Sequence, residues 1–425
     1  MQTSRQTRNT PLPRFPPELW LRIFDLATGV AGLLDYNGEG SSDLPLSIVK
    51  QTQLKQLKKS LVEKRSLVQV CKSWHELASE YLYQSVIITR VRTLESLCSA
   101  LEKSEKDTSI SALRRPLGWR TKRLDVIIQD QRCEAEDYAL LAIIMRHFPN
   151  LSIVTLSMPM LPFHDCWLRK LPTAVVASLA ETCGSSLRAF DCSESILRPS
   201  RDDLMFLLAS APNLRSLRCP ICSPSAGEKP LRNRMDMPVM PELRSIVLMS
   251  VFLHDYLPKN KEINRFPALR ELTYDCIPPP FYDRDWQNFI QLSCKNVTTV
   301  YIDFCLQGES LQKELDLLTE CCPSLEKLVI FIRSWAELKE NLVLPPVSRL
   351  GLYCSVHKGS STHYRDLFSA LGTMTAPQLK AVRLLHHQNV EDLRKNHTSV
   401  LTEGIARLAP HSFHLEDDEG NLILS

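Results

Sequence analysis

An alternation of apolar and polar positions recurs through most of this chain. The phrase has the form Pro-x-Leu-x-x-Leu-x-Leu. Its clearest copies begin at Leu151, Leu187, Leu214, Leu243, Leu269, Val297, Leu325, Val347 and Leu379. From Leu187 to Leu325 the copies follow one another at steps of 27, 29, 26, 28 and 28 residues. One strand, one helix and two turns fit within such a step. The pattern therefore predicts a solenoid of repeated strand and helix coils.

Between these copies, apolar residues recur at the spacing of a helix, which predicts helices at 202–208, 286–290, 311–321 and 364–371. Two earlier apolar runs, at 83–88 and 121–128, predict leading strands of the same sheet. The pattern resembles the longer type of leucine-rich repeat, although the asparagine that usually follows the strand is mostly missing. We expect an α/β fold in which short parallel strands line the inner side of an arc and helices close its outer side.

Two stretches near the N-terminus, residues 15–24 and 66–78, have helical periodicity instead. Their apolar positions are Leu19, Trp20, Ile23 and Phe24 in the first stretch, and Leu67, Val70, Cys71, Trp74, Leu77 and Ala78 in the second. Proline at the start of the first stretch suits a helix N-terminus, where the missing amide has no intrahelical partner. A pair of helices this short cannot hide so many large apolar groups, so we expect another protein to cover part of them.

The two stretches together resemble an F-box. The first is similar to the Leu/Phe-Pro-x-Glu-Leu-x-x-x-Ile-Phe opening of that family, and the second to its Val-Cys-x-x-Trp helix. In this family the module binds the Skp-type adaptor of a cullin-RING ubiquitin ligase of the SCF type. The resemblance implies an adaptor-binding set of Phe15, Pro16, Leu19, Trp20, Ile23, Phe24, Val70, Cys71 and Trp74. The alternative is that these helices only cap the repeat array.

The domain organisation follows from these patterns. We expect a disordered tail at residues 1–11, an F-box-like domain at 12–84, a leucine-rich-repeat solenoid at 85–415 and a C-terminal tail at 416–425. The F-box-like domain contains an insertion, about residues 29–62, where the usual link between the two halves is short. Its second part predicts a helix with a basic face formed by Lys55, Lys58, Lys59 and Lys64. We expect that face to be solvated rather than to bind nucleic acid or a membrane.

Strand positions that point away from the core should line the concave face of the arc. The candidates there are Arg215, Arg218, Arg244, Arg270, Thr273, Tyr301, Asp303 and Lys327. These residues would bind a protein substrate. The other interpretation is that they are ordinary soluble positions of a sheet surface.

Composition narrows the class of ligand. The net charge of +3 on 425 residues argues against nucleic acid as the main partner. There are only 13 glycines against 27 prolines, and neither GxxxxGK[ST] nor GxGxxG occurs, so no nucleotide or other cofactor is expected. The sequence has no secretory signal and no apolar run long enough to span a bilayer. We therefore expect reduced cysteines, no membrane association and a cytoplasmic or nuclear location.

Signals for catalysis are weak. Cys219 and Cys222 form a C-x-x-C pair without a second pair, so no metal site is expected. His75-Glu76 does not continue to a second histidine, and no GxSxG elbow is present. No catalytic residue is assigned. The alternative is an enzyme whose site is not recognised in the sequence. That site would lie around His164 and Asp165 or within residues 222–237.

These observations favour a non-catalytic substrate-recognition subunit of an SCF-type ubiquitin ligase. The F-box module would bind the adaptor and the arc would hold an unknown protein substrate, while the ligase transfers ubiquitin in trans. A rigid solenoid would raise the effective concentration of a substrate lysine near the charged ubiquitin carrier. The alternative is a leucine-rich-repeat scaffold with no ligase association.

Overall fold

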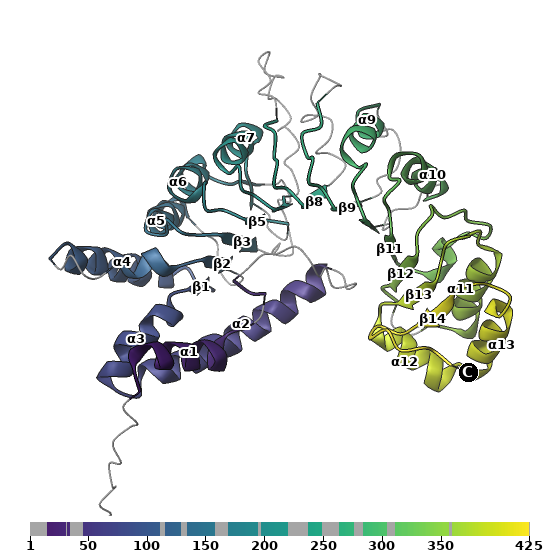
Figure 1. The fold of residues 1–425 in the computed structure, drawn as a ribbon, viewed down its shortest axis with the longest axis horizontal. Coiled ribbons are helices and arrows are strands. Elements are labelled where there is room, and N and C mark those ends of the chain that lie inside the picture. Colours follow the sequence, from purple (N-terminus) through teal and green to yellow (C-terminus); the bar gives the residue numbers. More distant parts are fainter. Residues whose placement is uncertain are drawn as a thin grey trace, which may run out of the picture.

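The protein forms an arc of strands and helices with a small helical module at its N-terminal end (Figure 1). In this computed structural model the described residues are 15–30, 32–34, 46–110, 115–128, 134–157, 169–193, 197–219, 237–248, 263–275, 284–303, 311–356 and 359–424. The expected tail at residues 1–11 lies outside them.

A single parallel sheet runs the length of the arc. Its 12 strands are ordered β1-β2-β3-β5-β7-β8-β9-β10-β11-β12-β13-β14. They are β1 Ser85–Ile88, β2 Arg123–Ile127, β3 Ile153–Ser157, β5 Ala189–Asp191, β7 Ser216–Arg218, β8 Ser245–Leu248, β9 Glu271–Asp275, β10 Thr299–Asp303, β11 Lys327–Ile332, β12 Arg349–Cys354, β13 Ala381–Leu384 and β14 His414–Glu416. Strands β4 (Arg169–Lys170) and β6 (Leu197–Arg198) form a separate parallel pair. The expected strand repeats and both leading strands are confirmed.

Helices pack on the outer side of the sheet, as Figure 1 shows. They are α4 Thr93–Ile110, α5 Ala135–Arg146, α6 Thr173–Cys183, α7 Arg201–Ser210, α9 Arg284–Ser293, α10 Leu311–Cys321, α11 Ser361–Thr373 and α13 Thr398–Leu408. Helix α12 (His387–Asn396) follows β13, and short 3₁₀ turns occur at η1 (Leu117–Arg120) and η2 (Trp335–Glu337). The helices expected at 202–208, 286–290, 311–321 and 364–371 correspond to α7, α9, α10 and α11. The architecture is that of a leucine-rich-repeat-like solenoid.

Stacking of neighbouring repeats forms the core. The sheet register aligns Leu272 with Val300 and Val300 with Leu328, and all three side chains are fully buried. Each repeat thus places an apolar residue against its equivalents in the two adjacent repeats. A repeat cannot bury this face alone, so stability depends on the array rather than on any single coil.

The C-terminal residues close one edge of the sheet. Beyond β14 the chain turns back, so that the Ile423 amide donates to the Leu415 carbonyl at 2.9 Å and Glu416 pairs with Leu422 in antiparallel fashion. Residues 417–424, expected as a tail, are therefore an integral part of the solenoid end.

The N-terminal module consists of α1 (Pro17–Thr28), α2 (Leu46–Val68) and α3 (Lys72–Leu82). The expected single helix over 66–78 is wrong, because the chain turns between α2 and α3. Cys71 is the N-cap of α3, where its sulfur accepts a hydrogen bond from the Trp74 amide at 3.5 Å. A side-chain acceptor just before a helix satisfies an amide that would otherwise lack a partner, which favours a helix start there.

Helix α2, the inserted segment, lies along the inner side of the first repeats (Figure 1). Lys50 near its start donates to the Asp191 carboxylate at the end of β5, 2.9 Å away. Between α1 and α2, the Leu33 carbonyl accepts from the Arg123 guanidinium of β2 at 3.1 Å. The insertion thus ties the helical module to the solenoid.

The expected basic face of this helix is confirmed only in part. Lys55, Lys58 and Lys59 are exposed, but Lys64 is buried. Burial lowers the pKa of Lys64, and the nearby Asp25 carboxylate opposes that effect. Lys64 faces the module because it lies four residues after the buried Ser60 and seven after the buried Leu57, on the side of α2 that packs inward. In the part of the chain that the structure describes, no helix is long and apolar enough to cross a membrane.

Candidate protein-interaction surfaces

Aromatic side chains hold the N-terminal module together. The Trp74 ring lies 4.8 Å from Trp20 and 4.9 Å from Phe24, and Phe24 contacts Tyr81 edge-on at 6.4 Å. The Tyr81 hydroxyl donates to the Leu21 carbonyl at 2.8 Å, which fixes α3 against α1. These contacts give the short helices a packed interior, so the geometry of their outer surface is well defined.

One face of α1 remains uncovered. Leu19, Ile23 and Leu26 recur at helical spacing and are 48%, 41% and 77% exposed. We call these three residues the α1 stripe. Phe15, just before the helix, and Val70, before α3, are also about half exposed. Contiguous large apolar groups of this kind mark interaction sites on soluble proteins.

The structure divides the residues expected to bind an adaptor into three groups. Phe15, Pro16, Leu19, Ile23 and Val70 are exposed, and Trp20, Cys71 and Trp74 are partly buried. Phe24 has no exposed surface, so it belongs to the core of the module and cannot contact a partner directly. The correction has a simple cause: helical spacing places Phe24 one position past Ile23, on the side of α1 that faces α3. Leu26 was missed, although its distance from Leu19 and Ile23 along the chain places it on the same stripe.

The second surface is the inner face of the sheet. The register aligns Thr273, Tyr301, Val329, Gly351 and Arg383 across β9 to β13. Alternation along a strand points these side chains away from the helices. They form the middle row of the inner face.

Aromatic rings gather on this face over β10 to β13. Tyr301 stacks on Phe331 with ring centroids 6.3 Å apart, Phe331 meets Tyr353 edge-on at 5.8 Å, and Tyr353 lies 5.0 Å from His386. We call these four residues the inner aromatic cluster. Gly351 lies beside them, and a β-carbon there would come within 3.0 Å of Leu385 Cδ1. The glycine leaves room for Leu385 to pack across the strand.

Positive charge lies beside this cluster. The Lys327 ammonium is 5.6 Å from the centre of the Tyr301 ring, a distance at which cation–π attraction operates. Burial, together with the charges of Arg383 and Arg349, lowers the pKa of Lys327 to about 8. Arg383 forms an ion pair with Glu416 at 2.8 Å. The Asp303 Oδ1 atom is buried and has no hydrogen-bond partner in the described residues.

The eight candidate substrate-binding residues do not share one row. Arg218, Thr273, Tyr301, Asp303 and Lys327 belong to strand positions of the inner face. Arg215, Arg244 and Arg270 each stand immediately before a strand, one position out of that alternation. The Arg270 guanidinium donates to the Asn296 carbonyl in the next repeat at 2.9 Å, which is a contact between turns. The sequence interpretation counted neighbours on opposite sides of a strand as one surface. It also missed Phe331, Tyr353 and His386, which the alternation from Tyr301 and Lys327 could have indicated.

Groups suited to catalysis do not converge in the described ranges. No three His, Cys, Asp or Glu side chains there could hold a metal ion. Cys219 is buried, and its sulfur lies 3.1 Å from that of Cys192. Burial raises the pKa of Cys192, so that thiol is a poor nucleophile. Cys222, His164, Asp165 and residues 222–236 lie outside the described residues.

Comparisons with known proteins add little to this picture. No protein-family model matches the chain. No curated protein matches it either. Among solved structures, the chain is similar to the leucine-rich-repeat-containing protein LegL7 from Legionella pneumophila, with a TM-score of 0.32 and 10% identity over 80% of this chain and 85% of that one. The repeat assignment rests on the strand and helix period of the structure itself.

Proposed function

We propose that this protein is the substrate-recognition subunit of an SCF-type cullin-RING ubiquitin ligase, in which the N-terminal module binds the Skp-type adaptor. The observation that carries the proposal is the α1 stripe of Leu19, Ile23 and Leu26, exposed on one face of a module whose interior is packed by Trp20, Phe24 and Trp74. A stable monomer gains nothing from three exposed aliphatic side chains in a row. A partner that covers them would gain about 1 to 2 kcal/mol for each.

The repeat solenoid is a protein-interaction scaffold, and its inner aromatic cluster is the surface we assign to the substrate. Tyr301 is only 4% exposed, so the contact area would come from the partly exposed rings of Phe331, Tyr353 and His386. The two surfaces belong to one rigid array, because α2 ties the module to β2 and β5 through Leu33 and Lys50. That rigidity keeps the substrate at a fixed distance from the adaptor, as transfer of ubiquitin by the other subunits requires.

Adaptor binding is the direct test. Purified full-length protein is mixed with a Skp-type adaptor, and the complex is measured by size-exclusion chromatography and calorimetry. The triple variant Leu19→Ser, Ile23→Ser, Leu26→Ser should lose at least about 100-fold in affinity, because three apolar contacts are removed together. These side chains are already exposed, so folding should be unaffected. Val343→Ser, at an exposed apolar residue of the solenoid, is the matched control and should bind normally.

A scaffold without ligase association is the second candidate. It is favoured by the tethering of α2 to the inner face, since a cap on the array would be held in the same way. The same experiment separates the two. A folded wild-type chain that binds no Skp-type adaptor would leave the scaffold as the function.

A further inference from the structure

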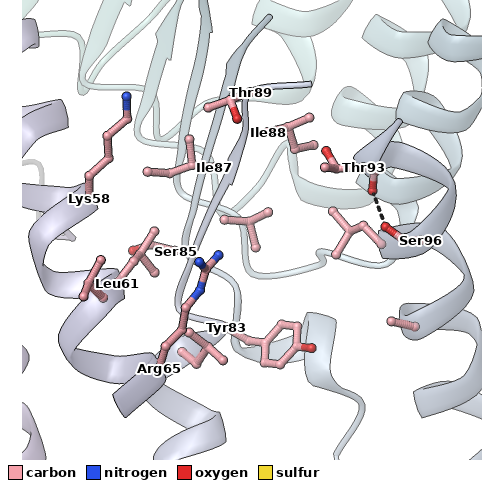
Figure 2. A pocket seen from close by; sticks show the side chains of 15 residues that line it. Lys58, Leu61, Arg65, Tyr83, Ser85, Ile87, Ile88, Thr89, Thr93 and Ser96 are labelled. Carbon is pink, nitrogen blue, oxygen red and sulfur yellow. Dashed lines mark hydrogen bonds between the residues drawn. The ribbon is translucent and has the colours of Figure 1, made fainter. Parts of the chain in front are cut away.

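A groove opens between α2, β1 and α4, at the edge of the sheet opposite to the closed C-terminal edge (Figure 2). Its volume is about 550 Å³. The lining residues from α2 are Lys58, Leu61, Val62 and Arg65, and those from α4 are Thr93, Ser96, Leu97 and Ala100. The floor is the consecutive run Ser85 to Thr89, so the groove follows the strand itself.

The strand in this floor has one unpaired side. Ser85 aligns with Arg123 of β2, and the Arg123 amide donates to the Gln84 carbonyl at 3.1 Å. Parallel pairing then uses the backbone groups of residues 84, 86 and 88, and those of residues 85, 87 and 89 point toward the groove. β1 is the first strand of the sheet, and no backbone hydrogen bond from the described residues reaches the amides of Ser85 or Ile87.

The two edges of the sheet differ in this respect. The edge at β14 is paired with the chain's own residues 421–423. At the β1 edge, between two helices, the amides of Ser85 and Ile87 have no backbone partner among the residues that the structure describes. An open edge of this kind is a template for an added strand.

A buried hydroxyl in the groove points to the same conclusion. Ser85 is only 2% exposed, and its Oγ atom has no hydrogen-bond partner among the described residues. Burying a hydroxyl without a partner is unfavourable, and native structures rarely leave one. Because Ser85 lines the groove beside the free strand edge, a backbone group of a bound segment would satisfy it.

The charge of the lining residues indicates what kind of segment would bind in the groove. None of the lining residues is acidic, and two, Lys58 and Arg65, are basic. Figure 2 shows the Arg65 guanidinium pointing into the space between α2 and β1. Neither cation forms an ion pair with a residue that the structure describes. The chain's own first 14 residues contain Arg5, Arg8 and Arg14 and no Asp or Glu, so they carry the wrong charge to fill this groove.

We propose that an extended acidic segment of another protein adds as a strand to the free edge of β1. Its backbone pairs with residues 85, 87 and 89, its acidic side chains face Lys58 and Arg65, and the alternate apolar side chains face Leu97 and Ala100. Lys58 and Arg65 are about 10 Å apart along α2, which corresponds to about three residues of a strand. Same-face positions of a strand are about 7 or 13 Å apart, so a segment with Asp or Glu at every second position brings acidic groups within reach of both long, flexible cationic side chains. The inference does not depend on adaptor binding by α1.

The first test uses a fluorescent peptide of alternating Glu and Val, with the full-length protein, and measures binding by anisotropy. The double variant Lys58→Glu, Arg65→Glu should weaken binding at least about tenfold and should bind an alternating Lys and Val peptide instead. Lys55→Glu, Lys59→Glu is the matched control, because both residues are exposed on the same helix outside the groove. Equal loss in the control would mean general attraction of polyanions and would overturn the proposal.

The second test addresses strand pairing. Two peptides are compared, one N-methylated at every Glu and the other at every Val, and the one whose methylated amides face β1 should bind at least about tenfold more weakly than the parent, since that edge can no longer pair. Ile87→Pro removes an amide that points to the groove and keeps the pairing of β1 with β2, so it should reduce binding relative to Ile87→Val. If both methylated peptides bind as well as the parent, strand addition is overturned, and that readout remains if Ile87→Pro does not fold.

Two other occupants would also overturn the proposal. If deletion of residues 1–14 strengthens peptide binding at least about tenfold, the chain's own N-terminus fills the groove. If sedimentation shows a dimer that Lys58→Glu, Arg65→Glu dissociates, the occupant is a second copy of the chain.

Discussion

The two halves of the inner face use polar residues for different purposes. Along β1 to β5, α2 lies against the sheet, and the charges of Arg123, Asp125, Asp191 and Lys50 are satisfied within the chain. Along β10 to β13, no helix of the described residues lies over the inner face, and the aromatic cluster occupies it (Figure 1). The first half thus connects the module to the array, and the second carries the aromatic cluster that we assign to a partner.

Two arginine–carboxylate ion pairs, one in each half, differ in their burial. Arg123 binds both carboxylate oxygens of Asp125 in the first half, with side chains 9% and 2% exposed. Arg383 binds Glu416 in the second half, with side chains 26% and 15% exposed. The arginine–carboxylate pair is therefore buried in the first half, where α2 covers the sheet, and more exposed to solvent in the second half. Burial decides how much each pair should matter, because a charge left without a partner is costly only where water is excluded.

The largest effect is expected from Arg123→Met. This change leaves the Asp125 carboxylate buried without its partner and removes the hydrogen bond to Leu33. We expect a loss of about 3 kcal/mol in the free energy of unfolding, measured by urea denaturation.

Arg383→Met is the matched control for that measurement. It should cost about 1 kcal/mol, because Glu416 remains accessible to water. Equal losses in the two variants would show that α2 does not exclude water from the first half, and the contrast between the halves would fail.

Much of the fold could be predicted from the sequence, because a repeat imposes the same requirement many times. The apolar phrase at Leu214, Leu243 and Leu269 predicts β7, β8 and β9, and one irregular copy does not hide the period. The position of α2 could not be predicted in this way. Its path depends on single contacts, such as Lys50 with Asp191, between residues 141 positions apart. Nothing in the local pattern indicates such a pair.

The candidate surfaces were predicted unevenly for a related reason. Helical spacing predicted Leu19, Ile23 and Phe24 alike as adaptor-binding residues. Leu19 and Ile23 are exposed, whereas Phe24 is buried. Periodicity shows which residues share a face, but it does not show which face a neighbouring helix covers. On the sheet, Tyr301 was among the candidates and Phe331 was not, although the register pairs Phe331 with the candidate Asp303 on the same face.

Lys50→Met tests how firmly α2 is held. Burial alone would raise the pKa of Asp191, but the charges of Lys50 and Arg218 hold it below its ordinary value. Arg218 remains 3.7 Å away in the variant, so we expect a loss of about 1 to 2 kcal/mol in the stability of the α2 contact. Hydrogen exchange of the α2 amides measures it.

The stability that Lys50→Met loses should depend on pH. A carboxylate with a lowered pKa stabilises the fold above its ordinary value of 3.8, and the contribution disappears as the pH falls through the folded value. The difference between Lys50→Met and wild type should therefore shrink in acid. Lys55→Met, on the exposed face of α2, should stay within about 0.5 kcal/mol of wild type at every pH. Faster exchange in Lys55→Met than in Lys50→Met would contradict the proposed tether.

The smallest effect, and the opposite sign, is expected in the open half from Lys327→Met. Burial, with Arg383 and Arg349 nearby, lowers the pKa of Lys327 to about 8, so its charged form is unfavourable in the folded protein. Methionine should therefore raise stability at pH 7 by about 1 kcal/mol, after allowance for screening by solvent. As the pH rises through about 8, the wild-type lysine loses its proton and the advantage of the variant should decline. Thermal unfolding at pH 7 and pH 9.5 measures both values. A variant that is less stable than wild type at pH 7 would mean that Lys327 supports the fold, and that this half of the inner face, like the first, is organised for folding rather than for a partner.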